Sequence, residues 1–152
     1  MLKAGIILAS YSPWSSPVCL INKPDGSKRF CIDYRQVNNI TVQDPFPLPR
    51  IEDLLDKLGG ATIFFYIDLN SGYWQIPMAK ESMSITAFST QKGHYEFRRL
   101  PFGLKNGPSF FSRVMASLFS DLETVIVYID DIFVFSDSVN YHFKALERTS
   151  SV

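Results

Sequence analysis

Two adjacent carboxylates, Asp130 and Asp131, interrupt an apolar run that extends from Thr124 to Ser136. An ionised carboxylate in apolar surroundings is strongly destabilising unless a partner, a shifted pKa or a bound cation compensates it. No Lys or Arg lies between Arg113 and Lys144, so the two acids have no local base. The pattern favours a divalent metal at a strand–turn–strand tip. The alternative is a hairpin whose aspartates simply point into water, because Asp is a common turn residue.

A third carboxylate, Asp68, shares this context because it also ends an apolar strand that has no basic neighbour. If the strands pair in one sheet, Asp68, Asp130 and Asp131 converge at one edge. Oxygen-rich carboxylate clusters suit Mg²⁺, and two such ions catalyse phosphoryl displacement. The spacing excludes an EF-hand, and zinc is disfavoured because His94 and His142 do not stand at ligand spacing with a cysteine. Taken alone, Asp68 is equally consistent with a strand-end cap.

The elements that must position these acids follow from hydrophobic periodicity and turn residues. We expect strands at 18–22 and 29–34 around a Pro-Asp-Gly turn, and an extended segment at 41–49, which holds three prolines. Helical spacing predicts helices over 50–58 and 109–122. Further strands are expected at 62–69, 84–89, 95–98 and on both sides of the Asp-Asp turn, and an apolar stretch resumes at 73–76. Together these elements predict a single α+β domain in which antiparallel strands are backed by helices.

The composition fits one intracellular globular chain of 152 residues, 46% of them hydrophobic. The formal net charge is zero, yet residues 1–50 carry six basic against three acidic side chains, so a basic front precedes an acidic rear. Such an arrangement suits a protein that grips a polyanion beside a metal site. Cys19 and Cys31 are expected to face each other across the hairpin as reduced thiols. No apolar run is long enough to span a membrane, and no secretory leader is evident.

Several further strings, in a fixed order, resemble one known family. Tyr128-Ile-Asp-Asp131 looks like the catalytic box of reverse transcriptases, and six other strings agree with it: Trp14-Ser-Ser-Pro-Val18, Lys23-Pro-Asp-Gly26, Arg29-Phe-Cys-Ile-Asp-Tyr-Arg35, Asp68-Leu-Asn-Ser-Gly-Tyr-Trp-Gln75, Thr86-Ala-Phe88 and Leu100-Pro-Phe-Gly-Leu-Lys-Asn106. Together they resemble the reverse transcriptase domain of gypsy-type LTR retrotransposon Pol polyproteins, from about residue 7 to 136. The resemblance implies an RNA-directed DNA polymerase with reverse-transcriptase-like fingers (mainly 1–60 and 80–100) and palm (mainly 61–79 and 101–136).

The resemblance also implies a role for each matching residue. Asp68, Asp130 and Asp131 would be the catalytic residues and hold two Mg²⁺ ions, with Mn²⁺ as a substitute. The nucleotide-binding set would hold the triphosphate, exclude a ribose 2′-hydroxyl at Tyr73 and line the pocket: Lys23, Arg29, Ser71, Gly72, Tyr73 and Phe102. The template-binding set would be Asp33, Tyr34 and Arg35. Singly, Lys23 and Arg29 are also typical of solvated hairpin charges, Tyr73 and Trp74 of core aromatics, and Phe102 of a buried turn anchor.

The chain departs from the family pattern at two places. Gly107-Pro108 stands where the family usually has alanine before proline, and Ser109-Phe-Phe-Ser112 replaces its usual threonine-phenylalanine-glutamine. After residue 136 we expect a truncated polar tail, 137–152, in which a helix begins at 141–146 and fades. The thumb is expected to be absent, and thumb and RNase H segments of a larger polyprotein would be the missing parts.

Two functions therefore stay open at the level of sequence. The first is an RNA-directed DNA polymerase that acts on an RNA or DNA template with a primer and on a dNTP. The second is an inactive retroelement remnant, or a co-opted module that binds nucleic acid or protein. A metal-dependent phosphatase or nuclease is disfavoured because no base or water-positioning histidine accompanies the acids. We expect an intracellular protein, neither secreted nor membrane-bound.

Overall fold

The computed structural model describes residues 1–69 and 71–151. Its internal contacts divide the chain into two compact units, where the sequence predicts one domain. We call them the basic unit (residues 1–43 and 71–107) and the acidic unit (44–70 and 108–152). The chain passes between them three times, so neither unit is continuous in sequence. Hydrophobic periodicity reports on local faces and carries no information about such crossings, which explains why one domain was expected.

The names of the units describe their charges. The basic unit holds ten Lys and Arg against four Asp and Glu, a net charge of +6. The acidic unit holds five against eleven, a net charge of −6. A chain that is neutral as a whole is therefore strongly polarised, in the same sense as the basic front and acidic rear of the sequence but to twice the degree.

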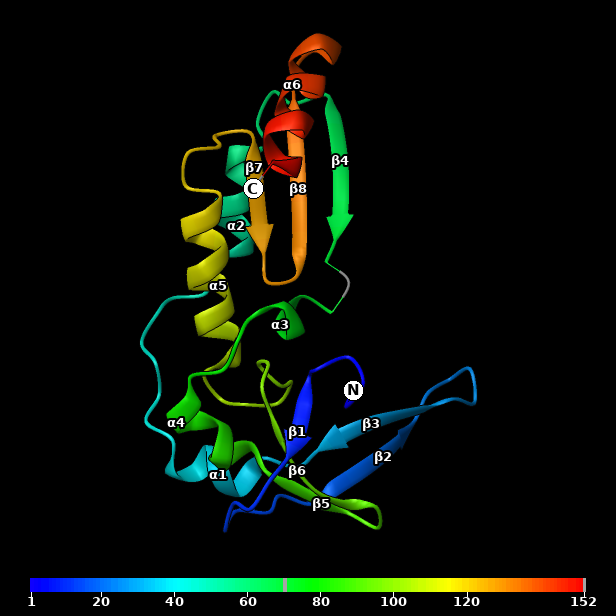
Figure 1. Cartoon of the computed structure of the whole chain (residues 1–152). Coiled ribbons are helices and arrows are strands. Elements are labelled where there is room, and N and C mark those ends of the chain that lie inside the picture. Colours follow the sequence, from blue (N-terminus) through cyan, green and yellow to red (C-terminus); the bar gives the residue numbers. More distant parts are fainter. Residues whose placement is uncertain (70, 152) are drawn as a thin grey trace. The chain divides into compact units, whose positions relative to one another are not determined.

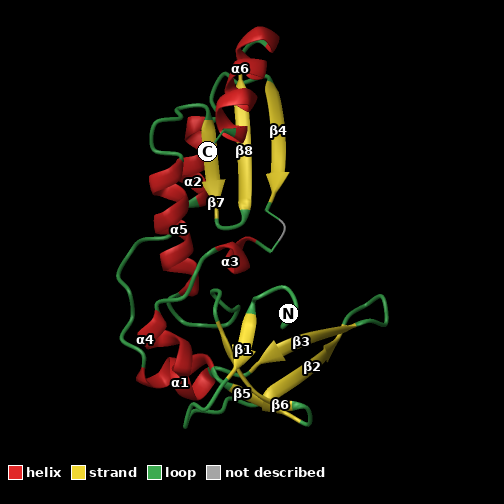
Figure 2. Ribbon diagram, viewed as in Figure 1, coloured by secondary structure: helices red, strands yellow, loops and turns green. Residues whose placement is uncertain are grey.

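Two antiparallel sheets build the basic unit (Figure 1, Figure 2). One has the strand order β1 (Ile7–Ala9), β6 (Gly93–Phe97), β5 (Phe88–Thr90), and the other is the hairpin of β2 (Val18–Asn22) and β3 (Lys28–Ile32). Ile7, Phe88 and Phe97 form the core of the first sheet. Short helices complete the unit: α1 (Arg35–Ile40), α3 (Gly72–Gln75), α4 (Lys80–Met83) and the 3-10 turn η1 (Ser84–Thr86).

The Pro-Asp-Gly turn of the β2–β3 hairpin is confirmed. Gly26 has φ +79°, a left-handed conformation that glycine adopts without strain. The Asp25 Oδ1 atom accepts hydrogen bonds from the backbone and hydroxyl of Ser27, which lowers the pKa of Asp25. Cys19 pairs directly with Cys31 across the hairpin, as expected, and both are free thiols.

A three-stranded antiparallel sheet forms the centre of the acidic unit. Its strand order is β4 (Ile63–Asp68), β8 (Asp131–Ser136), β7 (Val125–Tyr128) (Figure 1). Helices α2 (Ile51–Lys57) and α5 (Gly107–Leu118, whose first residue belongs to the basic unit) agree with the predicted helices. The extended segment 44–50 is fastened to α5, because Arg113 Nη2 bonds both carboxylate oxygens of Asp44 at 2.6 and 2.8 Å and its guanidinium lies 4.9 Å from the Phe46 ring.

The C-terminal segment corrects the predicted polar tail. Helix α6 runs from Val139 to Ser150 and buries His142, Ala145 and Thr149. The His142 ring bonds the Ser136 hydroxyl at the end of β8 (2.9 Å), and the Thr149 hydroxyl bonds the Ala145 carbonyl. The helix does not fade after residue 146 because its polar residues find partners within the unit.

Two smaller expectations are also wrong. Residues 84–86 form a 3-10 turn rather than part of a strand, because the Thr86 hydroxyl bonds the Met83 carbonyl and accepts the Phe97 N–H. The apolar stretch at 73–76 begins as the short helix α3. The sequence analysis also missed β1, α1 and α4, which are too short to show a hydrophobic period. No helix among the described residues is both long and apolar enough to cross a membrane.

Candidate active site

The Asp-Asp turn is a two-residue hairpin loop between β7 and β8. Tyr128 pairs with Asp131, so Ile129 and Asp130 form the loop itself. Ile129 has φ +55°, a left-handed conformation that is a true outlier for a β-branched residue. Such strain persists where the surrounding structure imposes it, and it collects at functional sites. Here the Leu69 N–H, just past the end of β4, bonds the Asp130 carbonyl at 3.3 Å and ties the loop to the neighbouring strand.

Asp68 lies directly opposite Asp131 in the β4–β8 pairing. Side chains of directly paired residues leave a sheet on the same face, so the two carboxylates face the same side. Asp130 is one residue away in the loop. The predicted convergence of the strands that carry the three acids at one end of one sheet is therefore confirmed.

Tyr66 is a member of this cluster that the sequence analysis missed. Its hydroxyl donates a hydrogen bond of 2.6 Å to Asp131 Oδ1, across a diagonal of the β4–β8 pair. This bond, a small burial effect and the nearby charges of Asp131 and Asp68 raise the pKa of Tyr66 to about 12. The signal was available, because Tyr66 stands two residues before Asp68 and therefore shares its face of the strand.

Asp130 is the electrostatically strained acid of the three. Burial, the Asp131 charge and the Asp68 charge, in that order, raise its pKa above the ordinary value. Its Oδ1 atom is buried, and the described residues offer it no hydrogen-bond partner. A buried, unpaired carboxylate oxygen is unfavourable, and a cation is one of the few groups that compensate it.

The donor set suits a hard divalent cation, since carboxylate oxygens are the ligands that Mg²⁺ prefers. Among the described residues, no three His, Cys, Asp or Glu side chains stand in an arrangement that could hold a metal ion as they are. The orphaned Asp130 oxygen nevertheless fits a cation, and the Tyr66 hydroxyl fixes one oxygen of Asp131. The three residues thus supply the right atoms, with further ligands still to come from substrate and water.

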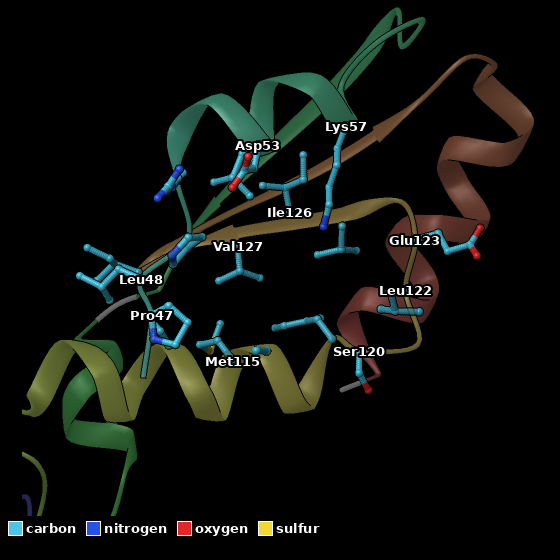
Figure 3. A pocket seen from close by; sticks show the side chains of 18 of the residues that line it. Pro47, Leu48, Asp53, Lys57, Met115, Ser120, Leu122, Glu123, Ile126 and Val127 are labelled. Atoms are coloured by element: carbon cyan, nitrogen blue, oxygen red, sulfur yellow. The ribbon is translucent and has the colours of Figure 1, made fainter. Parts of the chain in front are cut away.

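A cavity of about 790 Å³ lies behind the loop, between α2, α5 and β7 (Figure 3). Its walls are mostly apolar and include Met115, Ile126 and Val127, with Asp53 and Lys57 contributed by α2. Ile129 also lines it. The loop that carries Asp130 therefore borders open space on this side instead of packed side chains.

In the basic unit, Tyr73 and Phe102 form one aromatic pair. Their ring centroids are 4.8 Å apart, and Trp74 meets Phe102 edge-on at 6.0 Å. Tyr73 is buried, while Phe102 is about half exposed. Ser71, at φ 56°, caps α3, and Gly72 and Tyr73 begin it. Four of the predicted nucleotide-binding residues are thus near one another in the chain or in contact.

Gly107 is the second residue that the sequence analysis undervalued. A Cβ atom at this position would lie 3.2 Å from the Tyr73 ring, tighter than ordinary van der Waals contact. The replacement of the family's usual alanine by glycine is therefore a change beside Tyr73. The sequence shows the substitution but gives no sign of its neighbour.

The other two predicted residues of the nucleotide set, Lys23 and Arg29, lie on the β2–β3 hairpin. Lys23 stands at its tip, where its N–H bonds the Ser27 carbonyl, and Arg29 pairs with Ile21. Both side chains are exposed. The aspartates belong to the acidic unit and these residues to the basic unit, so each group is described within its own unit.

The predicted template-binding residues divide into an exposed pair and a buried anchor. Arg35 clasps the Asp33 carboxylate at 2.6 to 3.0 Å, which lowers the pKa of Asp33. The Tyr34 side chain is 2% exposed, and its hydroxyl donates to the Thr86 carbonyl; burial raises its pKa. Tyr34 therefore positions its neighbours and has little surface of its own to offer a strand.

Comparison with known proteins places this fold and this acidic turn in one family. The family model "Reverse transcriptase (RNA-dependent DNA polymerase)" matches residues 21–151. The chain belongs to that family, and the reverse-transcriptase-like fold predicted from the sequence is confirmed. Membership implies dependence on a divalent metal.

Relatives of gypsy type are among the similar proteins, as the sequence resemblance predicted. The chain is 44% identical to the retrovirus-related Pol polyprotein from transposon 297 of Drosophila melanogaster, covering 97% of this chain and 14% of that protein. It is 38% identical to the Pol polyprotein from transposon gypsy of the same organism, covering 97% and 15%. The enzymatic polyprotein of Cauliflower mosaic virus (strain Strasbourg) is 40% identical, with 93% and 22% covered. The chain thus spans less than a quarter of these relatives.

Solved structures agree. A foamy viral protease-reverse transcriptase in complex with double-stranded DNA matches with a TM-score of 0.89 and 31% identity, covering 97% of this chain and 26% of that one. The foamy viral protein in complex with an RNA/DNA hybrid matches with a TM-score of 0.85 and 30% identity, covering 97% and 20%.

Proposed function

We propose that this chain performs RNA-directed DNA synthesis, in which a primer 3′-hydroxyl attacks the α-phosphorus of a dNTP and pyrophosphate leaves. The observation that carries the proposal is the acidic cluster: Asp68 stands opposite Asp131, and Asp130 presents a buried oxygen without a partner. Family membership supplies the reaction class. The chain is a fraction of its relatives' length, so the activity, template and primer of the longer proteins are extended to it here as a hypothesis.

In this proposal Asp68, Asp130 and Asp131 hold two Mg²⁺ ions, with Mn²⁺ as a substitute. When bound, the ions lower the pKa of the attacking hydroxyl and neutralise the charge that develops on the leaving pyrophosphate. The chain itself contributes preorganisation. The register pairing fixes the spacing of Asp68 and Asp131, the Tyr66 hydroxyl holds Asp131 in one orientation, and the Ile129 backbone holds the loop of Asp130.

The basic unit would supply the groups that bind the nucleotide and the template. Lys23 and Arg29 would hold the triphosphate, and an exposed arginine fork suits phosphate oxygens. Ser71 and Gly72 would offer backbone donors, and Phe102 would line the pocket. Tyr73 is buried against Phe102, so its ring has little freedom to yield to a ribose 2′-hydroxyl. Asp33 and Arg35, held by Tyr34, would contact the template.

The test is extension of a DNA primer on an RNA template, with dNTPs, in Mg²⁺ and in EDTA. We expect incorporation that requires the metal and that Asp131→Asn abolishes. Asp121→Asn, an exposed acid of the same unit, is the matched control and should extend like the wild type. Incorporation that persists in EDTA or in Asp131→Asn contradicts the proposal. Binding without incorporation by the wild type favours the alternative of a non-catalytic nucleic-acid-binding module.

A second readout tests the role of Tyr73. Tyr73→Val opens the volume beside Phe102, so discrimination between dNTP and rNTP should fall by about tenfold or more, since 1.4 kcal/mol corresponds to tenfold. Equal discrimination in the variant and the wild type removes Tyr73 from the proposed nucleotide site while leaving the metal chemistry untouched.

A further inference from the structure

The basic unit contains a cavity of about 570 Å³ that no residue of the proposed active site lines. Three of its lining residues are basic: Lys80, Arg98 and Arg99. No Asp or Glu is among the described residues that line it. Glu81 follows Lys80 on α4 but is not part of the wall. The cavity therefore presents cations of one sign to whatever enters it.

Two of these cations are not neutralised by the protein. Among the described residues, neither Lys80 nor Arg98 takes part in an ion pair or a side-chain hydrogen bond. Arg99 differs, because its Nη1 atom donates to the Gln75 carbonyl at 3.0 Å, which anchors that guanidinium at the wall. Three unpaired or half-paired cations at one hollow repel one another, and an anion relieves that repulsion.

The backbone that carries the cations is tied together. The Arg98 N–H bonds the Ile6 carbonyl, and the Met78 N–H bonds the Arg98 carbonyl, both at 2.9 Å. Pro77 and Arg99 form an isolated antiparallel bridge. The N-terminal strand, the segment after α3 and the end of β6 therefore form one frame, and the positions of the cations do not depend on a mobile loop.

The rest of the wall is apolar and is formed by Leu8, Pro77, Met78 and Met83 together with small residues. A basic rim over an apolar floor matches a nucleotide unit, which joins an anionic phosphate to the less polar faces of a sugar and a base. The cavity volume lies within the range typical of sites for ligands of that size. A free metal-binding or acidic-peptide site would not call for this floor.

We infer that this cavity binds the sugar-phosphate backbone of a nucleic-acid strand, with Lys80 and Arg98 on a phosphate and the apolar floor beneath its nucleoside. The site lies in the unit with a net charge of +6, which favours a polyanion over a single small anion. The inference deepens the proposed function, on which it rests for the class of ligand. It adds a contact that is separate from the β2–β3 hairpin and from Asp33 and Arg35.

The experiment is binding of a fluorescent 20-nucleotide RNA and of the matching single-stranded DNA, by anisotropy, in EDTA and without dNTP. The test variant is Lys80→Ala/Arg98→Ala. Arg99 is left in place because it bonds Gln75. The control is Lys92→Ala/Lys144→Ala, which removes the same charge from two exposed residues that do not line the cavity. Circular dichroism verifies that all three proteins are folded.

We expect about tenfold weaker binding by the test variant at 50 mM salt, and a slope of log affinity against log salt that is smaller by about 1.4, since each single-strand phosphate contact contributes about 0.7. The control should change the slope by much less. Equal affinity and slope in the test variant and the control overturn the inference. So does a variant that loses affinity for dNTP but not for the strand, because the ligand is then a free nucleotide.

Two further outcomes separate this site from its rivals. If the wild type self-associates and the test variant does not, with strand binding unchanged, the cations bind the acidic unit of another copy and the inference is wrong. If the wild type fails to extend a primer but the test variant still lowers strand affinity, the proposed polymerase function fails and this site stands. If extension succeeds and strand affinity is unaltered, the reverse holds.

Discussion

Replacing Asp130 by asparagine should stabilise the protein although it removes a carboxylate from the proposed active site. The wild-type side chain is ionised at pH 7, yet its pKa is raised by burial and by the charges of Asp131 and Asp68. Its Oδ1 atom is buried without a partner. Asparagine keeps the shape, loses the charge and thereby removes both repulsions.

The magnitude follows from the electrostatics of a partly exposed cluster. Two unit charges 4 Å apart repel by about 1 kcal/mol in water, and solvent screening holds each repulsion here to about 0.5 kcal/mol. Two repulsions and the relief at the buried oxygen together give about 1 kcal/mol in the free energy of unfolding. In a chain of this size that corresponds to a rise of about 3 °C in Tm.

The dependence on pH has a definite sign. The folded pKa of Asp130 lies above its unfolded value near 3.8, so ionisation weakens the fold. The penalty is present at pH 7 and disappears as the pH falls below the unfolded pKa. The advantage of Asp130→Asn should therefore be largest near neutral pH and vanish near pH 3.

Urea unfolding in EDTA, followed by circular dichroism, provides the assay. Tryptophan fluorescence is unsuitable because Trp14 and Trp74 both belong to the basic unit. Asp121→Asn is the control and should change stability by less than about 0.5 kcal/mol. An Asp130→Asn protein that is no more stable than the wild type at pH 7 refutes the claim that this carboxylate is strained.

Four further predictions concern single contacts. Tyr66 should titrate near pH 12 by NMR, and Asp131→Asn should lower its pKa toward 10, because the hydrogen bond to Asp131 is the main cause of the shift; stability from this bond is present below pH 10 and lost as the pH rises through 12, and an unmoved Tyr66 pKa contradicts the bond. Gly107→Ala should cost about 1 kcal/mol and shift the Tyr73 ring resonances, because the new Cβ lies 3.2 Å from that ring; unchanged resonances mean that the ring yields freely. Arg113→Lys should destabilise the chain by about 1 kcal/mol in urea, because lysine loses the paired bonds to Asp44 and the stacking on Phe46, and equal midpoints refute that role. Arg35→Gln should raise the pKa of Asp33 toward 3.8 in a carboxyl NMR titration, and the stabilisation that Arg35 lends, present above the unfolded pKa, is lost as the pH falls through the lowered one; an unaltered Asp33 pKa shows that the two side chains part in solution.

Local chemistry made the acidic turn predictable. Apolar, β-branched flanks specify the strands on both sides of Asp130 and Asp131, and the lack of a base in 114–143 marks the acids as unusual. The position of Asp68 at a strand end then sufficed to expect the third carboxylate. The Pro-Asp-Gly hairpin was predictable for a similar reason, since Gly26 accepts a left-handed backbone that most residues resist.

Contacts between distant residues were not predictable in this way. The Tyr66 hydroxyl reaches Asp131 across 65 residues of sequence, and Gly107 lies beside the Tyr73 ring. The Thr86 hydroxyl replaces strand hydrogen bonds and turns 84–86 into a 3-10 turn. Helix α6 continues through a polar segment because Thr149 is buried there. In each case a tertiary neighbour, absent from the local pattern, decides the structure.

The most direct test of the central claim is single-nucleotide incorporation on a primed RNA template, measured in Mg²⁺ for the wild type and Asp130→Asn at equal folded concentration. The unfolding data make this comparison sharp, because the variant is expected to be the more stable protein. We predict incorporation by the wild type and a loss of at least about a thousandfold in Asp130→Asn, with Asp121→Asn unaffected. Equal rates in the wild type and Asp130→Asn contradict the assignment of this acidic cluster as the site of nucleotidyl transfer.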